Sequence, residues 1–469
     1  MKMVKKIYQN VDKLLFAAAI LIGISLCLTK NLTYDEYYSF ALAKHNLLDI
    51  ITITSNDVHP PAYYIGLHFF LALFPYQQAA KIFSLLFYIG YLALVQFGFK
   101  EYLSKEENTF FLFLSVFFPC MFIHGCNVRM YSFAMFWTLA AALLAVNFCR
   151  KDNSVGRNCL LIVCSLLAMY SHLFTMLGVF FLYLLILIYV IAKREIRRIL
   201  HFGVIGIFTA CGYLPWLSIT FQQATTHKNL IAPYDEDTFW VIVSEWFSSW
   251  HTPSRNSIHI GLFVTCLLCI IGIFSCIRKK IFLPMAGILP FFMVVITGVT
   301  MSILYEPCFF GRYAYAFIWG ILVLMSCGYA RLFKIGKIIT IILVFAMFFI
   351  NYRDELQMEF ENEQDVFEEF ASENIGDEDL IILSTVHGVL FETTSTRFLF
   401  GPVPAFSPFE NLDTLLYKEQ LLPFKDKTIW WIGFDKFVPT FWGHEAECML
   451  ELTYQKIEFS VWRVSYWGP

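Results

Sequence analysis

The sequence predicts a polytopic, all-α membrane protein with a small α/β domain at its C-terminal end. Hydrophobic residues make up 58% of the chain and charged residues only 15%, whereas a soluble globular protein is about half apolar and about a quarter charged. The apolar residues form runs long enough to cross a bilayer, and more than half of the 37 acidic residues follow residue 352. One water-soluble core cannot bury this much apolar surface, so we expect a membrane domain followed by a soluble one.

Eleven apolar runs are candidate membrane spans, because a span needs roughly 17–25 mostly apolar residues. The first run follows the basic sequence M-K-M-V-K-K and is not followed by an A-x-A-like cleavage site, so we expect an uncleaved span. The break at Ser171-His172 is also consistent with a merged or re-entrant element. The predicted spans are residues 14–28, 79–98, 109–123, 131–149, 159–172, 174–192, 199–220, 258–276, 282–304, 313–330 and 338–352.

Basic residues orient these spans through the positive-inside rule. If the N-terminus is cytoplasmic, the cytoplasmic segments hold more than half of the 34 Lys and Arg residues, and the longer loops on the other side hold far fewer. We therefore expect a multi-pass protein of the plasma membrane, with a transmembrane domain over residues 1–352 and an extracytoplasmic domain over residues 353–469. The cytoplasmic segments are the N-terminal tail, 99–108, 150–158, 193–198, 277–281 and 331–337.

Composition also excludes some classes of function. The net charge of -3 argues against nucleic acid as a partner. Most of the 13 cysteines fall inside apolar runs, where they behave as small hydrophobic residues. Their spacing predicts neither a zinc site nor a disulfide framework. In the C-terminal domain, the apolar stretches I-I-L-S-T, T-I-W-W-I-G-F and E-F-S-V-W-R-V alternate with helical segments, which is typical of an α/β or α+β unit.

The first external loop begins with T-Y-D-E-Y-Y-S-F, in which the adjacent carboxylates Asp35 and Glu36 lie among aromatic residues at the mouth of a span. The stretch A-L-A-K-H-N-L-L-D-I-I follows. Its apolar residues can share one helical face, which predicts a helix lying along the membrane surface. We expect this face to include Leu42, Leu47, Leu48 and Ile51.

The same loop continues with N-D-V-H-P-P-A-Y-Y. The two prolines remove two backbone donors and prevent a helix from running into them, so they hold Asp57 and His59 in a fixed extended segment. Tyr63 and Tyr64 follow directly. Amphipathic side chains of this kind are typical of the membrane interface.

Two arginines lie at external ends of spans, in R-M-Y, which contains Arg129 and Tyr131, and in G-R-Y, which contains Arg312. An arginine this close to the bilayer costs free energy unless it has a partner. A guanidinium group suits a phosphate, which it can hold through two parallel hydrogen bonds. A lipid-linked sugar phosphate fits this set, because arginines would stabilise the departing phosphate while a carboxylate accepts the proton of an attacking hydroxyl.

These motifs resemble the GT-C superfamily of integral-membrane glycosyltransferases, in the branch of protein O-mannosyltransferases and aminoarabinose (ArnT-like) transferases. Three motifs match in order and on the expected side: D-E in the first external loop, D-x-H-P-P-x-Y-Y later in that loop, and R-M-Y at the start of the fourth span. The number of spans and the external C-terminal domain agree as well. The resemblance covers about the first 330 residues.

The resemblance implies an inverting transfer of a sugar from a polyprenyl-phosphate donor to a cell-envelope acceptor (a glycan, lipid or protein) at the outer face of the membrane. Asp35 takes the family's catalytic position, with Glu36 beside it for acceptor or structural contacts. The remaining residues implied by the resemblance contact the donor phosphate (His59, Arg129, Tyr131 and Arg312) or line the substrate (Asp57, Tyr63 and Tyr64).

Two positions depart from the family pattern and leave the donor and any metal requirement open. Asn127 occupies a position where many bacterial relatives carry an acid, and His59 stands where the aminoarabinose enzymes have Lys. Asp57 and His59 can ligate a divalent cation, but two ligands do not make a metal site. The sequence implies no other cofactor.

Other interpretations of these residues exist. The acidic pair can be a solvated loop, the arginines can anchor the interface, and His172 is interpreted as a packed polar residue. A transporter or flippase for lipid-linked glycans would share the aromatic interface, but it more often has ionisable residues or broken helices at mid-membrane, with internal repeats. A scaffolding protein gives no reason for the loop motifs.

Overall fold

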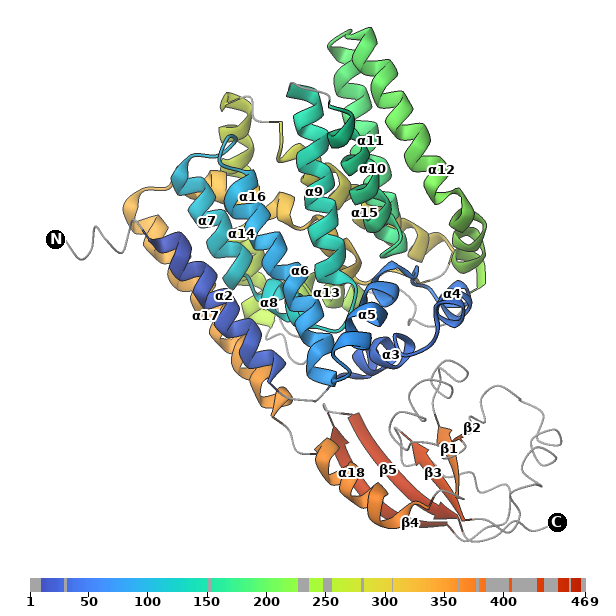
Figure 1. Ribbon diagram of the computed structural model, residues 1–469. Helices are drawn as coiled ribbons and strands as arrows, with labels where there is room; N and C mark the ends of the chain where they lie inside the picture. Colours follow the sequence, from blue (N-terminus) through green and yellow to red (C-terminus); the bar gives the residue numbers. More distant parts are fainter. Residues whose placement is uncertain are drawn as a thin grey trace. The chain divides into compact units, whose positions relative to one another are not determined.

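Each predicted span forms a helix or a bent pair of helices in the computed structural model of the chain (Figure 1). Seven helices among the described residues are long and apolar enough to cross a membrane, and nine spans result if each of two bent pairs counts as one. The other two predicted spans form the shorter helices α2 (Val11–Cys27) and α10 (Val155–Met169). The structure describes residues 10–28, 32–150, 154–226, 236–247, 255–279, 282–305, 307–360, 363–376, 379–384, 405–406, 428–433, 446–454 and 457–464.

The predicted membrane fold class is therefore confirmed, with 7 to 9 spans that meet the length and composition test in place of about eleven. The seven long helices are α6 (Gln77–Gly98), α9 (Tyr131–Arg150), α11 (Leu173–Ala192), α12 (Ile196–Thr226), α14 (Arg255–Lys279), α15 (Met285–Leu304) and α17 (Lys334–Glu359). The bent pairs are α7 (Lys105–Phe117) with α8 (Pro119–Cys126), and the 3-10 helix η1 (Gly311–Phe317) with α16 (Trp319–Tyr329).

The bend between α7 and α8 is 60° and follows from Pro119. A proline disfavours helical backbone in the residue before it, and Phe118 accordingly has extended dihedral angles, φ -70° and ψ 129°. Pro119 itself occupies the first turn of α8, where its missing N–H is no loss. The sequence thus breaks this span at a defined residue.

The chain is divided into two compact units, which we describe separately. The helical unit comprises Met1–Leu28 and Asn46–Leu356, and the sheet unit comprises Thr29–His45 and Gln357–Pro469. The helical unit contains, besides the spans, α4 (Leu47–Ser55), α5 (Ala62–Leu73) and α13 (Glu236–Ser244). Figure 1 shows α4 and α5 at the lower end of this unit, as expected for juxtamembrane helices of the first external loop.

The predicted surface helix is shorter than expected, because Leu42 does not belong to it. Asn46 accepts a hydrogen bond from the Asp49 N–H (3.0 Å) and starts a new helix, α4. The chain therefore breaks between Leu42 and Leu47, because an asparagine N-cap satisfies one of the free N–H groups at a helix start. Leu48, 76% exposed, and Ile51, 40% exposed, form an apolar outer face of the kind expected at a membrane surface.

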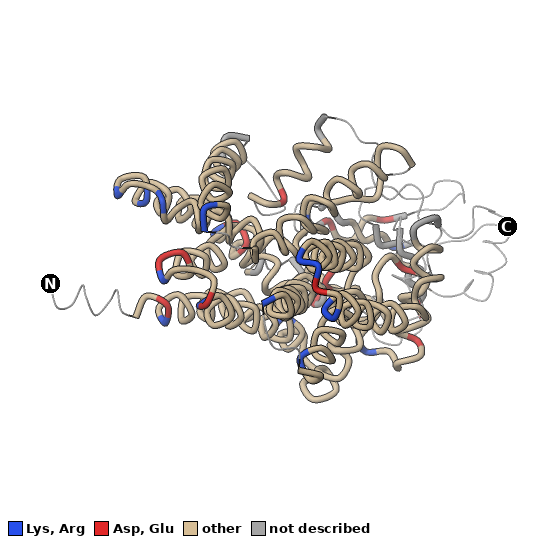
Figure 2. Tube along the Cα trace, turned by 90° about the horizontal axis from the view of Figure 1, so that it is seen from above, with Lys and Arg blue, Asp and Glu red and all other residues tan. Residues whose placement is uncertain are grey.

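Charged residues cluster at the end of the helical unit that the sequence assigns to the cytoplasm. Lys279 at the end of α14 pairs with Glu107 at the start of α7 (2.6 Å), and Lys337 at the start of α17 pairs with Glu106 (2.6 Å). Three helix ends predicted to share one side of the membrane therefore meet. Figure 2 shows Lys and Arg in short stretches while the helical coils are uncharged over most of their length. The compartment that each end faces stays a prediction.

Small residues allow α14 and α16 to pack closely. A Cβ atom at Gly272 would overlap the carbonyl oxygen of Leu324, and one at Gly328 would overlap that of Leu268. Close backbone approach through small residues is a common way for membrane helices to pack. The interface brings η1, which continues into α16, into a fixed position relative to the other spans.

We expect Gly328→Ala to lower the midpoint of thermal unfolding in detergent, because overpacking of this kind costs about 1–3 kcal/mol. Gly203→Ala is the matched control: a Cβ atom there meets nothing within 4 Å, and alanine favours the helix by up to about 1 kcal/mol. An unchanged midpoint for Gly328→Ala would contradict the close contact of the two backbones.

The sheet unit contains α3 (Tyr34–Leu42), α18 (Glu363–Asn374) and a mixed five-stranded sheet of order β2-β1-β3-β5-β4. Strand β1 runs parallel to β2 and β3, whereas β5 runs antiparallel to β3 and β4. The three stretches expected to be strands form β1 (Leu380–Ser384), β3 (Ile429–Gly433) and β5 (Ile457–Val464), and the others are β2 (Ala405–Phe406) and β4 (Ala446–Tyr454).

Side chains of helix α18 and of the sheet pack together in a small core. Phe370 packs edge-on against Trp430 (ring centroids 5.8 Å apart), and the Trp430 Nε1–H donates to Asp379 Oδ2 (2.9 Å). Trp430 and Val461 are buried. The predicted small α/β unit is thus present in the described residues.

Candidate functional site

Two links between helices and one 3-10 helix bring polar side chains together in the helical unit. The link after the α7–α8 pair carries Arg129, the break between α10 and α11 carries His172, and the 3-10 helix η1 carries Arg312 and Tyr313. Irregular backbone at membrane depth is tolerated where protein buries it or where it lines a polar cavity. These breaks are therefore the places where the fold can hold polar groups.

His59 lies at the centre of this cluster, 5% exposed, between α4 and α5. The Ala62 N–H just after the Pro60-Pro61 pair donates to the Tyr170 carbonyl oxygen (3.0 Å), which ties the start of α5 to the end of α10. The His59 ring consequently lies 5.2 Å from the His172 ring and 6.4 Å from the Tyr313 ring, measured between centroids. The segment from Asp57 to His59 is bent, whereas an extended segment was expected before the two prolines.

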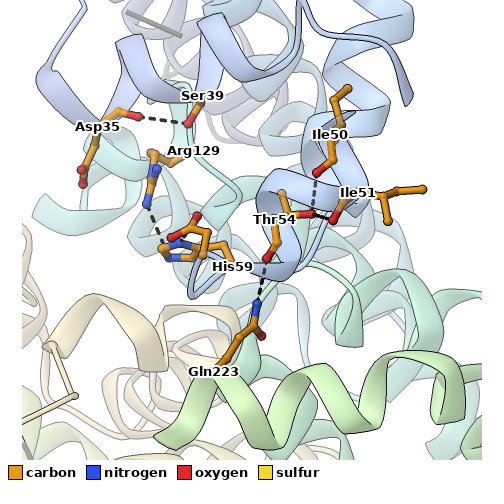
Figure 3. Close-up of polar contacts among 9 residues, drawn as sticks. Asp35, Ser39, Ile50, Ile51, Thr54, His59, Arg129 and Gln223 are labelled. Carbon is orange, nitrogen blue, oxygen red and sulfur yellow. Dashed lines mark hydrogen bonds and ion pairs between the residues drawn. The ribbon is translucent and has the colours of Figure 1, made fainter. Parts of the chain in front are cut away.

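Asp57, His59 and Arg129 form a row. Arg129 Nη2 lies 3.4 Å from His59 Nε2, as Figure 3 shows, and His59 Nδ1 lies 3.5 Å from Asp57 Oδ2. Because arginine can only donate, Nε2 is the acceptor, and a neutral His59 then carries its proton on Nδ1, toward the carboxylate. The buried Arg129 guanidinium is thereby held in place by residues of the segment between α4 and α5.

The electrostatics keep Asp57 ionised. Burial by itself raises the pKa of Asp57, but the hydrogen bond of His59, the Val58 N–H and the charge of Arg129 together lower it below its ordinary value. Its contribution to stability is thus fully present above the ordinary aspartate pKa and is lost only as the pH falls through the lowered value. At neutral pH, Asp57 is therefore ionised and remains paired with His59.

His172 joins the cluster while also starting α11. Its Nδ1 accepts the Phe174 N–H (3.1 Å), so it is the N-cap of that helix, and its ring packs on Tyr313 at 4.5 Å. Burial lowers the pKa of His172 well below its ordinary value, and the charges of His59, Arg129 and Arg312 lower it further. The interpretation of His172 as a packed polar residue agrees with its role as the N-cap of α11. It does not account for the position of the His172 ring beside the His59 ring.

Arg312 is paired with Glu245, a residue that sequence reasoning did not single out. Arg312 Nη1 donates to Glu245 Oε1 (3.2 Å), and the Arg312 backbone N–H donates to Oε2 (2.9 Å). The guanidinium also lies 4.3 Å from the centre of the Phe310 ring. The only sequence signal was an acid within an aromatic external loop, S-E-W-F.

The first residue of G-R-Y must be glycine, because the backbone of α13 packs directly against it. A Cβ atom at Gly311 would overlap the carbonyl oxygen of Ile242, and the Trp246 Nε1–H donates to the Gly311 carbonyl oxygen (2.9 Å). The segment after α13 is thereby held directly against the start of η1. The pair of Glu245 and Arg312 is therefore built into the fold.

The remaining predicted residues of the helical unit are buried side chains around the row. Tyr131 packs against His124 (ring centroids 4.9 Å apart), which in turn contacts Tyr315 (4.5 Å). Tyr63 and Tyr64 are both fully buried in α5. The Tyr63 hydroxyl forms a hydrogen bond with Ser84 Oγ on α6 (2.8 Å), so this tyrosine joins α5 to a span.

A second polar contact holds the first external loop to the long helix α12. Gln223 Nε2 donates to the Thr54 carbonyl oxygen at the end of α4 (2.8 Å; Figure 3). Both ends of the segment that carries Asp57 and His59 are thus attached, at Gln223 and at Tyr170. The site rests on a fixed loop.

Asp35 and Glu36 belong to α3 of the sheet unit, where they occupy the first turn. The Glu36 carboxylate accepts the Thr33 N–H (2.8 Å) and completes a capping box, and Glu36 is only 2% exposed. The Asp35 carbonyl oxygen accepts a hydrogen bond from Ser39 (3.0 Å; Figure 3). The two acids therefore differ. The Glu36 carboxylate takes part in the helix cap, and the Asp35 carboxylate is not part of that cap.

Within the part of the chain that the structure describes, no group of three or more His, Cys, Asp or Glu residues is arranged to hold a metal ion. Asp57 and His59 thus remain two candidate ligands. The described arrangement offers instead two guanidinium groups beside buried aromatic residues, which suits an anion with an apolar attachment.

The structure is similar to the crystal structure of ArnT from Cupriavidus metallidurans in the apo state, with a TM-score of 0.62 and 10% identity over 97% of this chain and 98% of that chain. The same protein bound to undecaprenyl phosphate gives a TM-score of 0.55 at 12% identity, over the same shares of the two chains. The oligosaccharyltransferase AglB from Archaeoglobus fulgidus, in complex with an inhibitory peptide and a dolichol-phosphate, gives 0.51 at 11% identity, over 91% and 70%.

The chain has the GT-C fold. No protein-family model and no curated protein sequence matches it. The similarity in structure confirms the GT-C resemblance at the level of fold and does not separate the ArnT-like branch from the O-mannosyltransferase branch. The Asp57–His59–Arg129 row lies in the GT-C helical unit, in the loops that the fold leaves between its spans.

Proposed function

We propose that this protein is a glycosyltransferase that moves a sugar from a polyprenyl-phosphate donor to an acceptor at the outer face of the plasma membrane. The observation that carries the proposal is the buried Arg129, aligned by His59 and Asp57 in the loops of a GT-C fold. ArnT of the same fold has been crystallised with undecaprenyl phosphate, which supports a donor of that chemical class here.

In the proposed reaction, an acceptor hydroxyl attacks the anomeric carbon of the sugar as the bond from that carbon to the phosphate oxygen breaks. The hydroxyl proton goes to Asp35, the general base, and the polyprenyl phosphate leaves with one additional negative charge. Attack from the face opposite the leaving group inverts the anomeric centre. Arg129 stabilises the charge that develops on the phosphate, where a fixed cation in a dry site is most effective.

The other residues support this step. His59 holds the Arg129 guanidinium, and Asp57 holds His59 in the tautomer that accepts from it. Arg312 supplies a second positive charge, which the ionised carboxylate of Glu245 partly neutralises. The role of Asp35 rests on its motif, and the roles of Tyr63, Tyr64 and Tyr131 as substrate-lining residues remain part of the proposal.

A direct test supplies proteoliposomes with a radiolabelled polyprenyl-phosphate sugar and a membrane extract as the acceptor source, and follows both products. Broken spans also occur in transporters, so the assay measures donor movement across the bilayer alongside the glycosylated product. Labelled product that requires Arg129 supports glycosyl transfer. Donor movement with no glycosylated product would instead identify a flippase.

Glu245 gives the proposed site a pH dependence. Burial raises the pKa of Glu245 more than Arg312 and nearby N–H groups lower it, so the folded protein binds this proton more tightly than the unfolded chain does. As the pH falls through the raised pKa toward the ordinary glutamate value, Glu245 becomes neutral and Arg312 is released. We expect the affinity for undecaprenyl phosphate to rise in this window, and Glu245→Gln to remove the rise.

The measurement is the apparent Kd for undecaprenyl phosphate between pH 4.5 and pH 7.5, for the wild type and Glu245→Gln. Glu106→Gln is the matched control, because Glu106 pairs with Lys337 at the other end of the helical unit. Identical pH profiles for the wild type and Glu245→Gln would exclude Glu245 as the group that controls Arg312.

A further inference from the structure

A polar pocket lies at the end of the helical unit opposite the His59 row. Helix α9 begins two residues after Arg129 and ends at Arg150, so its 20 residues separate the two places by about 30 Å. The cavity has a volume of about 350 Å³ and opens where α9, α11 and α14 end. Its lining includes Glu101, Tyr102, Arg150, Tyr189, Lys279 and Phe282, and we name it the Arg150 pocket.

Two cations form cation–π contacts with tyrosines of this pocket. The Arg150 guanidinium carbon lies 4.3 Å from the centre of the Tyr102 ring, and Lys193 Nζ lies 5.7 Å from that of Tyr189. Neither cation forms an ion pair with a carboxylate of the described residues. Tyr102 is itself held, since its hydroxyl donates to Asn147 Oδ1 (2.5 Å). The pocket thus presents Arg150 in a fixed orientation.

The remaining charges leave the pocket positive. Lys279 is compensated by Glu107, which also closes the N-terminus of α7 through Ser104. Glu101, exposed at the rim, is the one acid in the lining. Among the described lining residues Arg150 and Glu101 then balance, and Lys193, which lies on the Tyr189 ring but outside the lining, adds one positive charge beside the pocket.

We propose that the Arg150 pocket binds the phosphodiester headgroup of an anionic phospholipid. An arginine fork holds two oxygens of a phosphate, tyrosines favour the interfacial depth at which headgroups lie, and basic pockets between membrane helices are known to take acidic lipid headgroups. Exposed apolar residues on the surrounding helices, Ile188 at 55% and Ile277 at 68%, provide a surface for the acyl chains. This site is independent of the proposed sugar transfer.

Native mass spectrometry of the detergent-purified full chain tests the site with dioleoylphosphatidylglycerol, with dioleoylphosphatidylcholine, and with inorganic phosphate alone. We expect Arg150→Gln to weaken phosphatidylglycerol binding about tenfold or more, as is usual when a hydrogen bond to a charged group is lost. Arg157→Gln removes the same charge from an exposed position on α10 outside the pocket, and it should bind as the wild type does.

The other outcomes decide the proposal as well. Equal losses for Arg150→Gln and Arg157→Gln, or equal binding of the two lipids by the wild type, would overturn it. Equal affinity for inorganic phosphate would make this an ion site and would also overturn it. Should Arg150→Gln fail to fold, Arg150→Lys retains the charge but loses the fork. It should bind the anionic lipid several-fold more weakly than Arg157→Lys, and equal binding would count against the proposal.

Discussion

We expect the replacement of Arg129 by glutamine to lower the rate of the proposed sugar transfer by about a thousandfold, the loss typical of removing one preorganised group that stabilises developing charge. Arg129 is 6% exposed and is aligned by His59 at 3.4 Å, so solvent cannot take its place at the phosphate. We expect the affinity for the polyprenyl-phosphate sugar donor to fall as well. The loss in kcat should exceed the loss in affinity, because the second negative charge appears only as the bond breaks.

The measurement is initial-rate transfer in proteoliposomes, with the midpoint of thermal unfolding recorded for each variant. Arg129→Lys keeps the charge without the fork and should retain an intermediate rate. Arg157→Gln, exposed on α10, is the matched control and should transfer normally. Normal transfer by a folded Arg129→Gln protein would remove Arg129 from the mechanism.

We expect the replacement of Asp35 by asparagine to lower kcat by about 10² to 10⁴, the range for loss of a general base. Asparagine is nearly isosteric and still suits the first turn of α3, so the fold should persist. The affinity for polyprenyl phosphate should stay within about twofold of the wild type, because the proposed role of Asp35 concerns the acceptor proton alone.

Glu36→Gln is the natural control for Asp35→Asn, because it changes the adjacent acid. Glu36 completes the capping box through the Thr33 N–H, and glutamine can complete the same box, so the fold should persist. Transfer per folded molecule should change little. If Glu36→Gln abolished transfer while Asp35→Asn did not, the assignment of the base to Asp35 would be wrong.

The sequence was sufficient to predict the span helices and the polar ends of the helical unit, because long apolar runs and clustered Lys and Arg are local properties. The prolines after His59 also act on their own neighbours, but the segment before them is bent and not extended as expected. The N-cap at Asn46 was missed, because hydrophobic spacing suggested a continuous helix from Leu42 to Ile51.

Long-range pairs could not be predicted. Glu245 meets Arg312 across 67 positions in the sequence, and His172 meets His59 only because the Ala62 N–H bonds to Tyr170. Such contacts depend on how spans pack, which composition and periodicity do not specify. The family resemblance places Glu36 beside Asp35 for acceptor or structural contacts, and the structure adds a local role, because the Glu36 carboxylate accepts the Thr33 N–H.

The central claim is that this chain transfers a sugar from a polyprenyl phosphate with the help of Arg129 and Asp35. The most direct test is a single-turnover experiment with purified wild-type protein, Asp35→Asn and Arg129→Gln in proteoliposomes loaded with labelled donor and acceptor extract. The account predicts a burst of glycosylated product and free polyprenyl phosphate from the wild type alone, with donor still bound by Asp35→Asn. Equal bursts from all three proteins, or no glycosylated product from any, would contradict it.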